Sequence, residues 1–222
     1  RLRSHIDVHH DRGLIHVSTS IHPTAVISPT AQLGQDVRVG PYSVVGENVR
    51  VGDRTEIGAQ VVIDGVTHIG EDNRIVGQTS LGGAPQDFSY RGEPTQLIIG
   101  DGNTIREFVT INRGTIKGGG QTRVGSNNLL MACSHVAHDC EIEDHVILGN
   151  GVLLAGHVLV EHHANLSGMA GAVAFVTVGA YSYVGAMTRM SRDVPPYMIV
   201  EGHDSRVRGV NVVGLERAGI GG

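Results

Sequence analysis

The chain has 222 residues and a formal net charge of −5. It contains 32 glycines, no tryptophan and only 4% aromatic residues, so small aliphatic side chains must fill its core. The negative charge argues against a nucleic-acid-binding protein, which needs clustered positive charge. No apolar run approaches the roughly 18 residues that span a membrane, and the first residues lack the apolar segment of a signal peptide. We therefore expect a cytoplasmic protein that binds no nucleic acid and does not insert into membranes.

Aliphatic residues recur at every sixth position in the first part of the chain. The run consists of Ile21, Ile27, Leu33, Val39, Val45, Val51, Ile57, Ile63, Ile69, Ile75 and Leu81. A strand has a period of two and a helix a period of 3.6, so a period of six fits strands. Each hexad predicts a short strand and a turn, with one aliphatic side chain pointing inward. Three hexads make a coil of about 18 residues, and stacked coils form a solenoid of parallel strands.

The period is interrupted at two places. It stops at residues 82–97, for which we predict a loop excursion, and again at the glycine-rich residues 116–122, for which we predict a turn between coils. It then continues from Val124 to Met190, and two prolines are predicted to end it. The β-helix domain is therefore expected over 21–195, after an N-terminal extension at 1–20. Residues 196–222 predict the start of a C-terminal helical segment, which we expect to be truncated.

Two histidines, two cysteines and an aspartate lie within the segment CSHVAHDC at 133–140. Residues one coil apart in a solenoid lie above one another at the spacing of neighbouring strands, about 4.8 Å. His157 follows Asp139 by one coil length, so the pattern predicts that His138, Asp139 and His157 meet at one edge. Histidine suits proton transfer near neutral pH. Asp139 can orient His138 only if the pair lies at a corner, because neighbours along a strand point to opposite faces.

The hexads, each an aliphatic residue followed by glycine, resemble the hexapeptide-repeat acyltransferases, whose coils form an all-β, left-handed parallel β-helix. Within that superfamily the chain is similar to the UDP-N-acetylglucosamine acyltransferases over residues 20 to 220. The segments that carry this resemblance are NNLLMACSHVAHDC, LLAGHVLVE, GAPQDFSYRGEPT, IREFVTINRGT and DVPPYMIVEG. The resemblance implies a homotrimer that transfers a 3-hydroxyacyl chain from acyl carrier protein to the glucosamine 3-hydroxyl of UDP-N-acetylglucosamine. That reaction is the first step of lipid A biosynthesis, and the resemblance implies no metal and no cofactor.

The resemblance also implies roles for individual residues. His138 would be the general base, and the Gly156 N–H would stabilise the oxyanion, since glycine allows close approach. The matching substrate-binding positions are Gln86, Asp87, His135, His157, Asn211 and Arg217. Ala186 occupies the position of the family's acyl-length ruler, where a residue larger than glycine favours a shorter acyl chain.

Two other interpretations of the histidine cluster stay open. A zinc site of His135, His138 and His157 would suit a hydratase like the γ-class carbonic anhydrases, which share the fold. Alternatively, the cluster is a set of surface histidines on an inactive scaffold, as we interpret His9, His10, His162 and His163. Cys133 and Cys140 fall at different positions of the hexad, and we predict that both are reduced and buried as small hydrophobic residues.

The chain departs from the family pattern at four positions. Val173 and Ala174 replace a His-Gln pair, Ser89 replaces a lysine, and Ala218 replaces an arginine. Each loss removes a possible charge-assisted hydrogen bond, worth about 1.5–3 kcal/mol where it forms. The sequence therefore leaves open an altered acceptor, such as a 3-amino sugar, and a paralogue without activity. It does not fix the acyl chain length.

Overall fold

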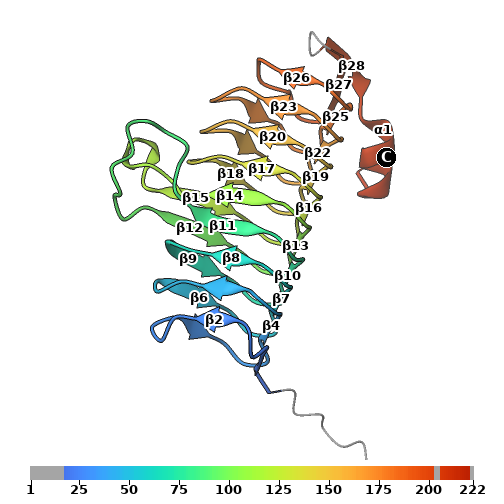
Figure 1. Ribbon diagram of the computed structural model, residues 1–222. Helices are drawn as coiled ribbons and strands as arrows, with labels where there is room; N and C mark the ends of the chain where they lie inside the picture. The colour runs from blue at the N-terminus through green and yellow to red at the C-terminus, as the bar shows by residue number, and fades with distance from the viewer. Residues whose placement is uncertain (1–17, 203–205, 221–222) are drawn as a thin grey trace, which may run out of the picture.

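The computed structural model describes residues 18–202 and 206–220, and it is a parallel β-helix with a short helix near its C-terminal end (Figure 1). Most of the predicted N-terminal extension, with His9 and His10, lies outside the described residues. Strands follow one another around three faces, so every third strand belongs to the same sheet. Register pairs such as Arg38 with Glu56 and Ile147 with Asn165 are 18 residues apart. The predicted coil length is therefore confirmed.

The strands are short and fall into three sheets. The first sheet contains β1 (Ser20–Ile21), β4 (Arg38–Val39), β7 (Glu56–Ile57), β10 (Arg74–Ile75), β13 (Thr104–Ile105), β16 (Leu129–Leu130), β19 (Ile147–Leu148), β22 (Asn165–Leu166), β25 (Tyr183–Val184), β27 (Met198–Glu201) and β28 (Arg206–Val210). The second contains β2 (Val26–Ile27), β5 (Val44–Val45), β8 (Val62–Ile63), β11 (Ser80–Gly83), β14 (Thr110–Asn112), β17 (His135–Val136), β20 (Leu153–Leu154), β23 (Gly171–Ala172) and β26 (Arg189–Met190). The third contains β3 (Gln32–Leu33), β6 (Val49–Val51), β9 (Val66–Ile69), β12 (Gln96–Ile99), β15 (Gln121–Val124), β18 (Glu141–Ile142), β21 (Leu159–Val160) and β24 (Thr177–Val178).

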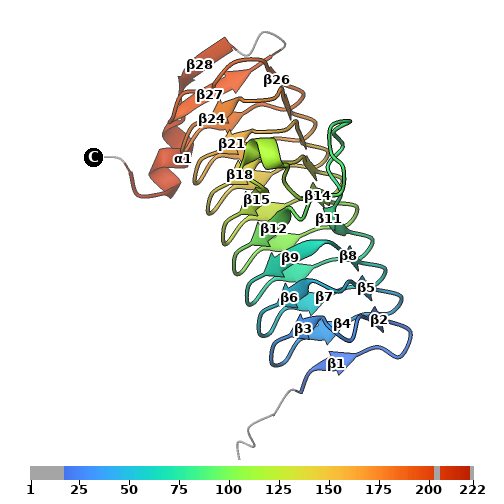
Figure 2. The ribbon, with the colours of Figure 1, turned by 90° about the vertical axis from the view of Figure 1, so that its left-hand side faces the viewer.

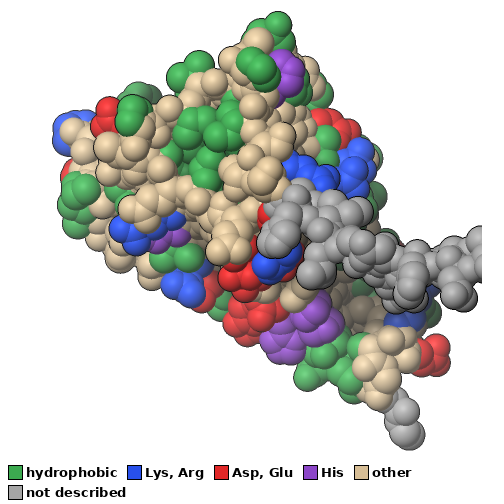
Figure 3. All heavy atoms as spheres, turned by 90° about the horizontal axis from the view of Figure 1, so that it is seen from below, with side chains coloured by type: hydrophobic (Ala, Val, Ile, Leu, Met, Phe, Trp, Pro, Cys, Tyr) green, Lys and Arg blue, Asp and Glu red, His purple; other side chains and the backbone are tan. Residues whose placement is uncertain are grey.

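The core contains the predicted column of aliphatic side chains, but in many hexads a second aliphatic residue two positions earlier is also buried, so the prediction of one inward side chain per hexad is incomplete. In a typical strand such as β5, Val44 points outward and is 40% exposed, whereas Val45 is 1% exposed. Every predicted inward residue from Val39 to Met190 is buried in this way. Ile21, in the first coil, is 44% exposed, and the other predicted inward residues of that coil, Ile27 and Leu33, are only partly buried. Seen from below, hydrophobic side chains gather on this end of the solenoid (Figure 3).

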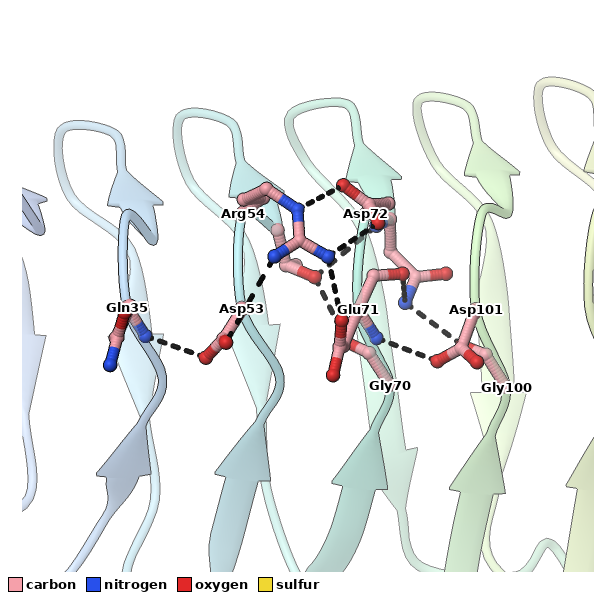
Figure 4. A network of polar contacts seen from close by, with 10 residues as sticks. Gln35, Asp53, Arg54, Gly70, Glu71, Asp72, Gly100 and Asp101 are labelled. Atoms are coloured by element: carbon pink, nitrogen blue, oxygen red, sulfur yellow. Dashed lines mark hydrogen bonds and ion pairs between the residues drawn. The ribbon is translucent and has the colours of Figure 1, made fainter. Parts of the chain in front are cut away.

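Carboxylates bind neighbouring coils together at the corner between the third and first sheets (Figure 4). The Asp53 carboxylate accepts the Gln35 N–H at 2.7 Å. Arg54 donates to Asp72 at 2.8 Å and to Glu71 at 2.6 Å. These side chains reach the adjacent coil because equivalent positions are stacked in register. The Asp53 carboxylate in this way satisfies a backbone N–H that the strand ladders leave without a partner.

Two excursions leave the corner between the second and third sheets. The first occupies residues 84–95, since β11 continues through Gly83 and β12 begins at Gln96. The second occupies 113–120 and contains the 3-10 helix η1 (Ile116–Gly118), so it is longer than the predicted turn and ends before β15.

The C-terminal part differs from the prediction in one respect. The ladder does not end at the two prolines, because β27 pairs with β25 and then forms an antiparallel hairpin with β28. Helix α1 (Val212–Arg217) follows, as predicted. It lies on a different side of the solenoid from the excursions in both ribbon views (Figure 2). Neither helix of the described chain has the length and apolarity needed to cross a membrane.

Candidate active site

His138 and Asp139 are the two turn residues between β17 and β18, at the corner between the second and third sheets. Asp139 has a φ of 61°, in the left-handed region, so the alternation of side chains along a strand does not apply here. His138 Nδ1 lies 2.7 Å from Asp139 Oδ2. Because an ionised carboxylate only accepts hydrogen bonds, Nδ1 carries the proton and Nε2 keeps a free lone pair. The His138 ring is thus held in the tautomer that a general base requires.

His157 joins this pair from the next coil, as the repeat predicts. Its Nε2 lies 3.5 Å from Asp139 Oδ2, and its ring meets that of His138 edge to face at a centroid distance of 5.4 Å. One coil further on, Phe175 stacks on His157 at 4.4 Å with nearly parallel rings. The prediction that His138, Asp139 and His157 cluster at one edge is confirmed.

Asp139 receives support that the sequence did not predict. Its side chain has no exposed surface, and its two carboxylate oxygens accept the Thr115 N–H and hydroxyl, each at 2.6 Å. Thr115 belongs to the second excursion and directly precedes residues 116–122, for which the sequence predicts only a turn. The backbone at Gly118 lies against the Asp139 carboxyl group so closely that a side chain there would collide with it. The excursion therefore forms one wall of the site.

A pocket opens beside His138 on the outer face of the second sheet. Its lining includes Gln86, His135, His138, Leu153, Gly156 and Arg189. A Cβ atom at Gly156 would lie 2.6 Å from His138 Cε1, so only glycine leaves room for the imidazole. The Gly156 N–H has no acceptor among the described residues, so it is available to a ligand.

Leu153 and Arg189 were not predicted as part of the site. They occupy the outward position of β20 and β26, in the column that starts at His135 and passes through Gly171. Each step in this column is 18 residues, so the repeat contained the signal. Gly171 has no side chain, and this leaves a gap in the column between Leu153 and Arg189. The column forms the floor of the pocket.

Two candidate binding residues have shifted acid–base properties. Burial lowers the pKa of His135, whose Nδ1 lies 2.7 Å from the Thr110 hydroxyl, and the ring is therefore neutral near pH 7. The first excursion carries Asp87, whose pKa is lowered mainly because the Ser89 N–H donates to its Oδ1 at 2.7 Å. The Lys117 ammonium, which donates to the Ser89 hydroxyl at 2.9 Å, lowers the pKa of Asp87 further. The site therefore presents an ionised carboxylate and a neutral imidazole.

Comparison with known proteins identifies the family of this chain. The bacterial transferase hexapeptide family matches residues 30–65 and 121–156, and domain 2 of the UDP-N-acetylglucosamine O-acyltransferases matches residues 193–221. The chain is 58% identical, over 91% of its own length and 79% of the relative's, to the acyl-[acyl-carrier-protein]–UDP-N-acetylglucosamine O-acyltransferase of Alkalilimnicola ehrlichii. It is 54% identical to the enzyme of the same name from Anaeromyxobacter dehalogenans, over 90% and 78%. The chain belongs to the UDP-N-acetylglucosamine O-acyltransferase family.

A crystal structure of the family supports the assignment. The UDP-N-acetylglucosamine acyltransferase of Francisella novicida superposes on the chain with a TM-score of 0.89 and 39% identity, over 90% of this chain and 74% of that one. A solenoid of opposite hand would not superpose in this way. The chain is therefore a left-handed parallel β-helix, as the resemblance implied.

The departures from the family pattern lie within or near the site. Val173 lines the pocket and packs against the core, and Ala174 follows it at the turn, two coils from His138. Ser89 stands in place of the family's lysine, but the Lys117 ammonium lies against it and supplies a positive charge at this place. Ala218 is the C-terminal cap residue of α1.

Three residues with expected family roles lie away from His138. Asn211 caps helix α1 by accepting the Gly214 N–H at 3.1 Å, and its side-chain amide donates to the Tyr181 carbonyl at 2.8 Å. Arg217 lines a second pocket with Asn211 and Tyr181, at the corner between the third and first sheets. Ala186 is exposed at the remaining corner, between β25 and β26. A single chain does not bring these three residues to the His138–Asp139 pair.

The zinc interpretation receives no support from the comparisons or from the arrangement of the histidines. In the described part of the chain, the residues whose ligand atoms lie within 4.8 Å of one another are His138, Asp139 and His157, without His135.

The prediction of two buried cysteines is wrong for one of them. Both thiols are free, but Cys133 is exposed because it is a turn residue at the corner between the first and second sheets. Cys140 is buried, and its thiol donates to the Ala155 carbonyl at 3.1 Å. Burial raises the pKa of Cys140 to about 12. Neither thiol is placed to act in the site.

Proposed function

We propose that the chain transfers a 3-hydroxyacyl group from acyl carrier protein to the 3-hydroxyl of the glucosamine unit of UDP-N-acetylglucosamine. The observation that carries this proposal is the His138–Asp139 pair beside an apolar pocket, in a chain of this family. This reaction would be the first step of lipid A biosynthesis. We place the reaction in the cytoplasm, where both substrates are made.

The geometry supports a general-base mechanism. His138 Nε2 takes the proton from the sugar hydroxyl while Asp139 stabilises the imidazolium that forms. The sugar oxygen attacks the thioester carbonyl, and the Gly156 N–H donates to the oxygen that becomes negative. The C–S bond then breaks, and the imidazolium returns its proton to the departing carrier thiolate. The product is the O-acylated sugar nucleotide with the free carrier thiol, and no cofactor enters the balance.

The remaining site residues fit the recognition of the acceptor. Gln86 reaches the pocket from the first excursion, and Asp87, kept ionised there, can accept from a sugar hydroxyl. Neutral His135 and the His157 ring both lie near the base and can hydrogen-bond the sugar nucleotide. In this proposal the first excursion, His135 and His157 bind the acceptor, and His138 transfers the proton.

The test is an acyl-transfer assay with several 3-hydroxyacyl carrier proteins and UDP-N-acetylglucosamine, followed by mass spectrometry of the product. We expect wild type to form the ester and His138→Ala to lose at least about 100-fold in kcat. His22→Ala, which changes an exposed histidine of the first coil, is the matched control and should equal wild type. Absence of product from folded wild type with every donor would contradict the proposal. Product only with a 3-amino sugar nucleotide would change the acceptor.

We also propose that a complete site needs two copies of the chain within a homotrimer. Asn211 and Arg217 lie at a different corner from His138, so a neighbouring copy must bring them to the dyad. Mixing His138→Ala and Arg217→Ala chains tests this. Random mixing in equal amounts restores about a quarter of the sites if each site draws on two copies, and none if each draws on one.

Ala186 is proposed to limit the acyl chain from a third corner. Comparing rates with donors of increasing length tests this role, and Ala186→Gly should shift the preference toward longer chains. Equal rates for long and short donors would remove the assignment.

A further inference from the structure

Thr115 makes two of the shortest hydrogen bonds in the site. It is the N-cap residue of η1 and is 4% exposed. Its backbone N–H donates to Asp139 Oδ1 and its hydroxyl to Asp139 Oδ2, both at 2.6 Å. The Thr115 oxygen also accepts the Gly118 N–H at 3.3 Å, which leaves the hydroxyl proton for the carboxylate. The side chain is therefore a donor with one defined target.

The Asp139 carboxylate depends on such donors. With no exposed side-chain surface, it has no water to solvate its charge, and a buried carboxylate stays ionised only when hydrogen bonds replace that solvation. Oδ2 accepts from the Thr115 hydroxyl and from His138 Nδ1. Oδ1 is held by the Thr115 N–H, so rotation of the carboxylate would break all three of these bonds. Thr115 thus fixes both the charge and the direction of the group that orients the base.

We propose that Thr115 is a positioning residue of the acyl transfer, acting through Asp139 on His138. The proposal rests on the proposed function, since it assigns a role within that reaction. Thr115 belongs to a segment outside the repeat, and it is not one of the residues that line the pocket. The second excursion is in this view part of the catalytic apparatus and not a spacer between coils.

Thr115→Val tests the proposal because valine has the shape of threonine and keeps the backbone N–H but lacks the hydroxyl. We expect kcat to fall about 10- to 100-fold, the effect of one lost hydrogen bond to a charged group, with KM for both substrates changed less than about threefold. The acid limb of the pH profile of kcat/KM should move to higher pH. Without this donor the carboxylate keeps more negative charge facing His138, which stabilises the imidazolium form of the pair relative to the neutral imidazole. Thr115→Ser keeps the hydroxyl and should have the kcat of wild type and an acid limb at the wild-type pH.

A double-variant cycle separates this role from a structural one. If Thr115 acts through Asp139, adding Thr115→Val to Asp139→Asn should cost no further activity, although each change alone lowers kcat. The Asp139→Asn background also removes the buried charge, so the double variant remains measurable if Thr115→Val alone folds poorly. A wild-type pH limb and rate in Thr115→Val, or additive losses in the cycle, would overturn the proposal. Inactive wild type in the same assay would instead mean that the proposed function is wrong.

Discussion

Replacing Gly156 by alanine tests the position of the catalytic ring directly. The added Cβ would lie 2.6 Å from Cε1, 2.9 Å from Nε2 and 3.1 Å from Nδ1 of His138. Carbon atoms in contact prefer about 3.5–4.0 Å, so the imidazole must retreat by roughly 1 Å. Such a displacement either stretches the 2.7 Å bond to Asp139 or moves Nε2 away from the acceptor. A misplacement of this size costs about 100-fold in rate, or about 2.7 kcal/mol in activation free energy.

The expected loss should appear in kcat and not in folding. Gly156 does not have a positive φ, so its backbone accepts alanine, and the variant keeps the N–H proposed for the oxyanion. The assay is acyl transfer under saturating substrates, with circular dichroism to verify the fold. Gly209→Ala is the control, because a Cβ at Gly209 meets no atom within 4 Å. A folded Gly156→Ala enzyme with wild-type kcat would refute the assignment of His138 as the base in this position.

Three further outcomes follow from other parts of the molecule. Leu148→Ala, in the fully buried column, should lower the free energy of unfolding by about 2–5 kcal/mol, seen as a lower urea midpoint; an unchanged midpoint would contradict the packing argument. Lys117→Ala should raise KM for an anionic substrate, because the variant lacks the ammonium group beside Ser89. Adding Ser89→Lys should restore KM if a positive charge at this place is what the substrate needs. At pH 8 a thiol reagent should label Cys133 quickly and leave Cys140 unmodified, since thiolate is the reactive form and the pKa of Cys140 is raised to about 12; labelling of both at equal rates would argue against that burial.

The repeat made most of the fold predictable. The inward aliphatic side chain of each hexad marks both the strands and much of the core, because each one stacks in register on the coil below. The repeat did not predict the second buried set, such as Val61, Val109 and Val146, which lies two residues before the predicted column. The prediction failed for Ile21, since the first coil lacks a neighbour below it among the described residues. It also failed for the antiparallel hairpin of β27 and β28, which follows no six-residue period. Periodic reasoning works where each coil has two neighbours and fails at the ends.

The six-residue repeat also made part of the site predictable. His157 follows the neighbouring pair His138 and Asp139 by about one coil, so the repeat predicts that the three side chains meet, and the structure confirms it. Thr115 was missed because it lies in an excursion whose path the repeat does not determine. Arg189 was missed for a different reason: it obeys the repeat, but only the column through His135 shows that it reaches the pocket.

The departures from the family pattern separate binding from chemistry. The groups that set the tautomer of the base are Asp139 and, behind it, Thr115, and both are present with short hydrogen bonds. The lost polar pair at Val173 and Ala174 lies two coils further along, where the pocket leads away from the dyad. A side chain there can contact a bound substrate, but in this structure neither residue contributes a hydrogen bond to Asp139 or His138. The groups of the proposed proton-transfer step are therefore all present, so the altered positions bear on which substrate is held and how tightly. An interpretation of this chain as an inactive scaffold would have to explain why the buried carboxylate keeps its donors.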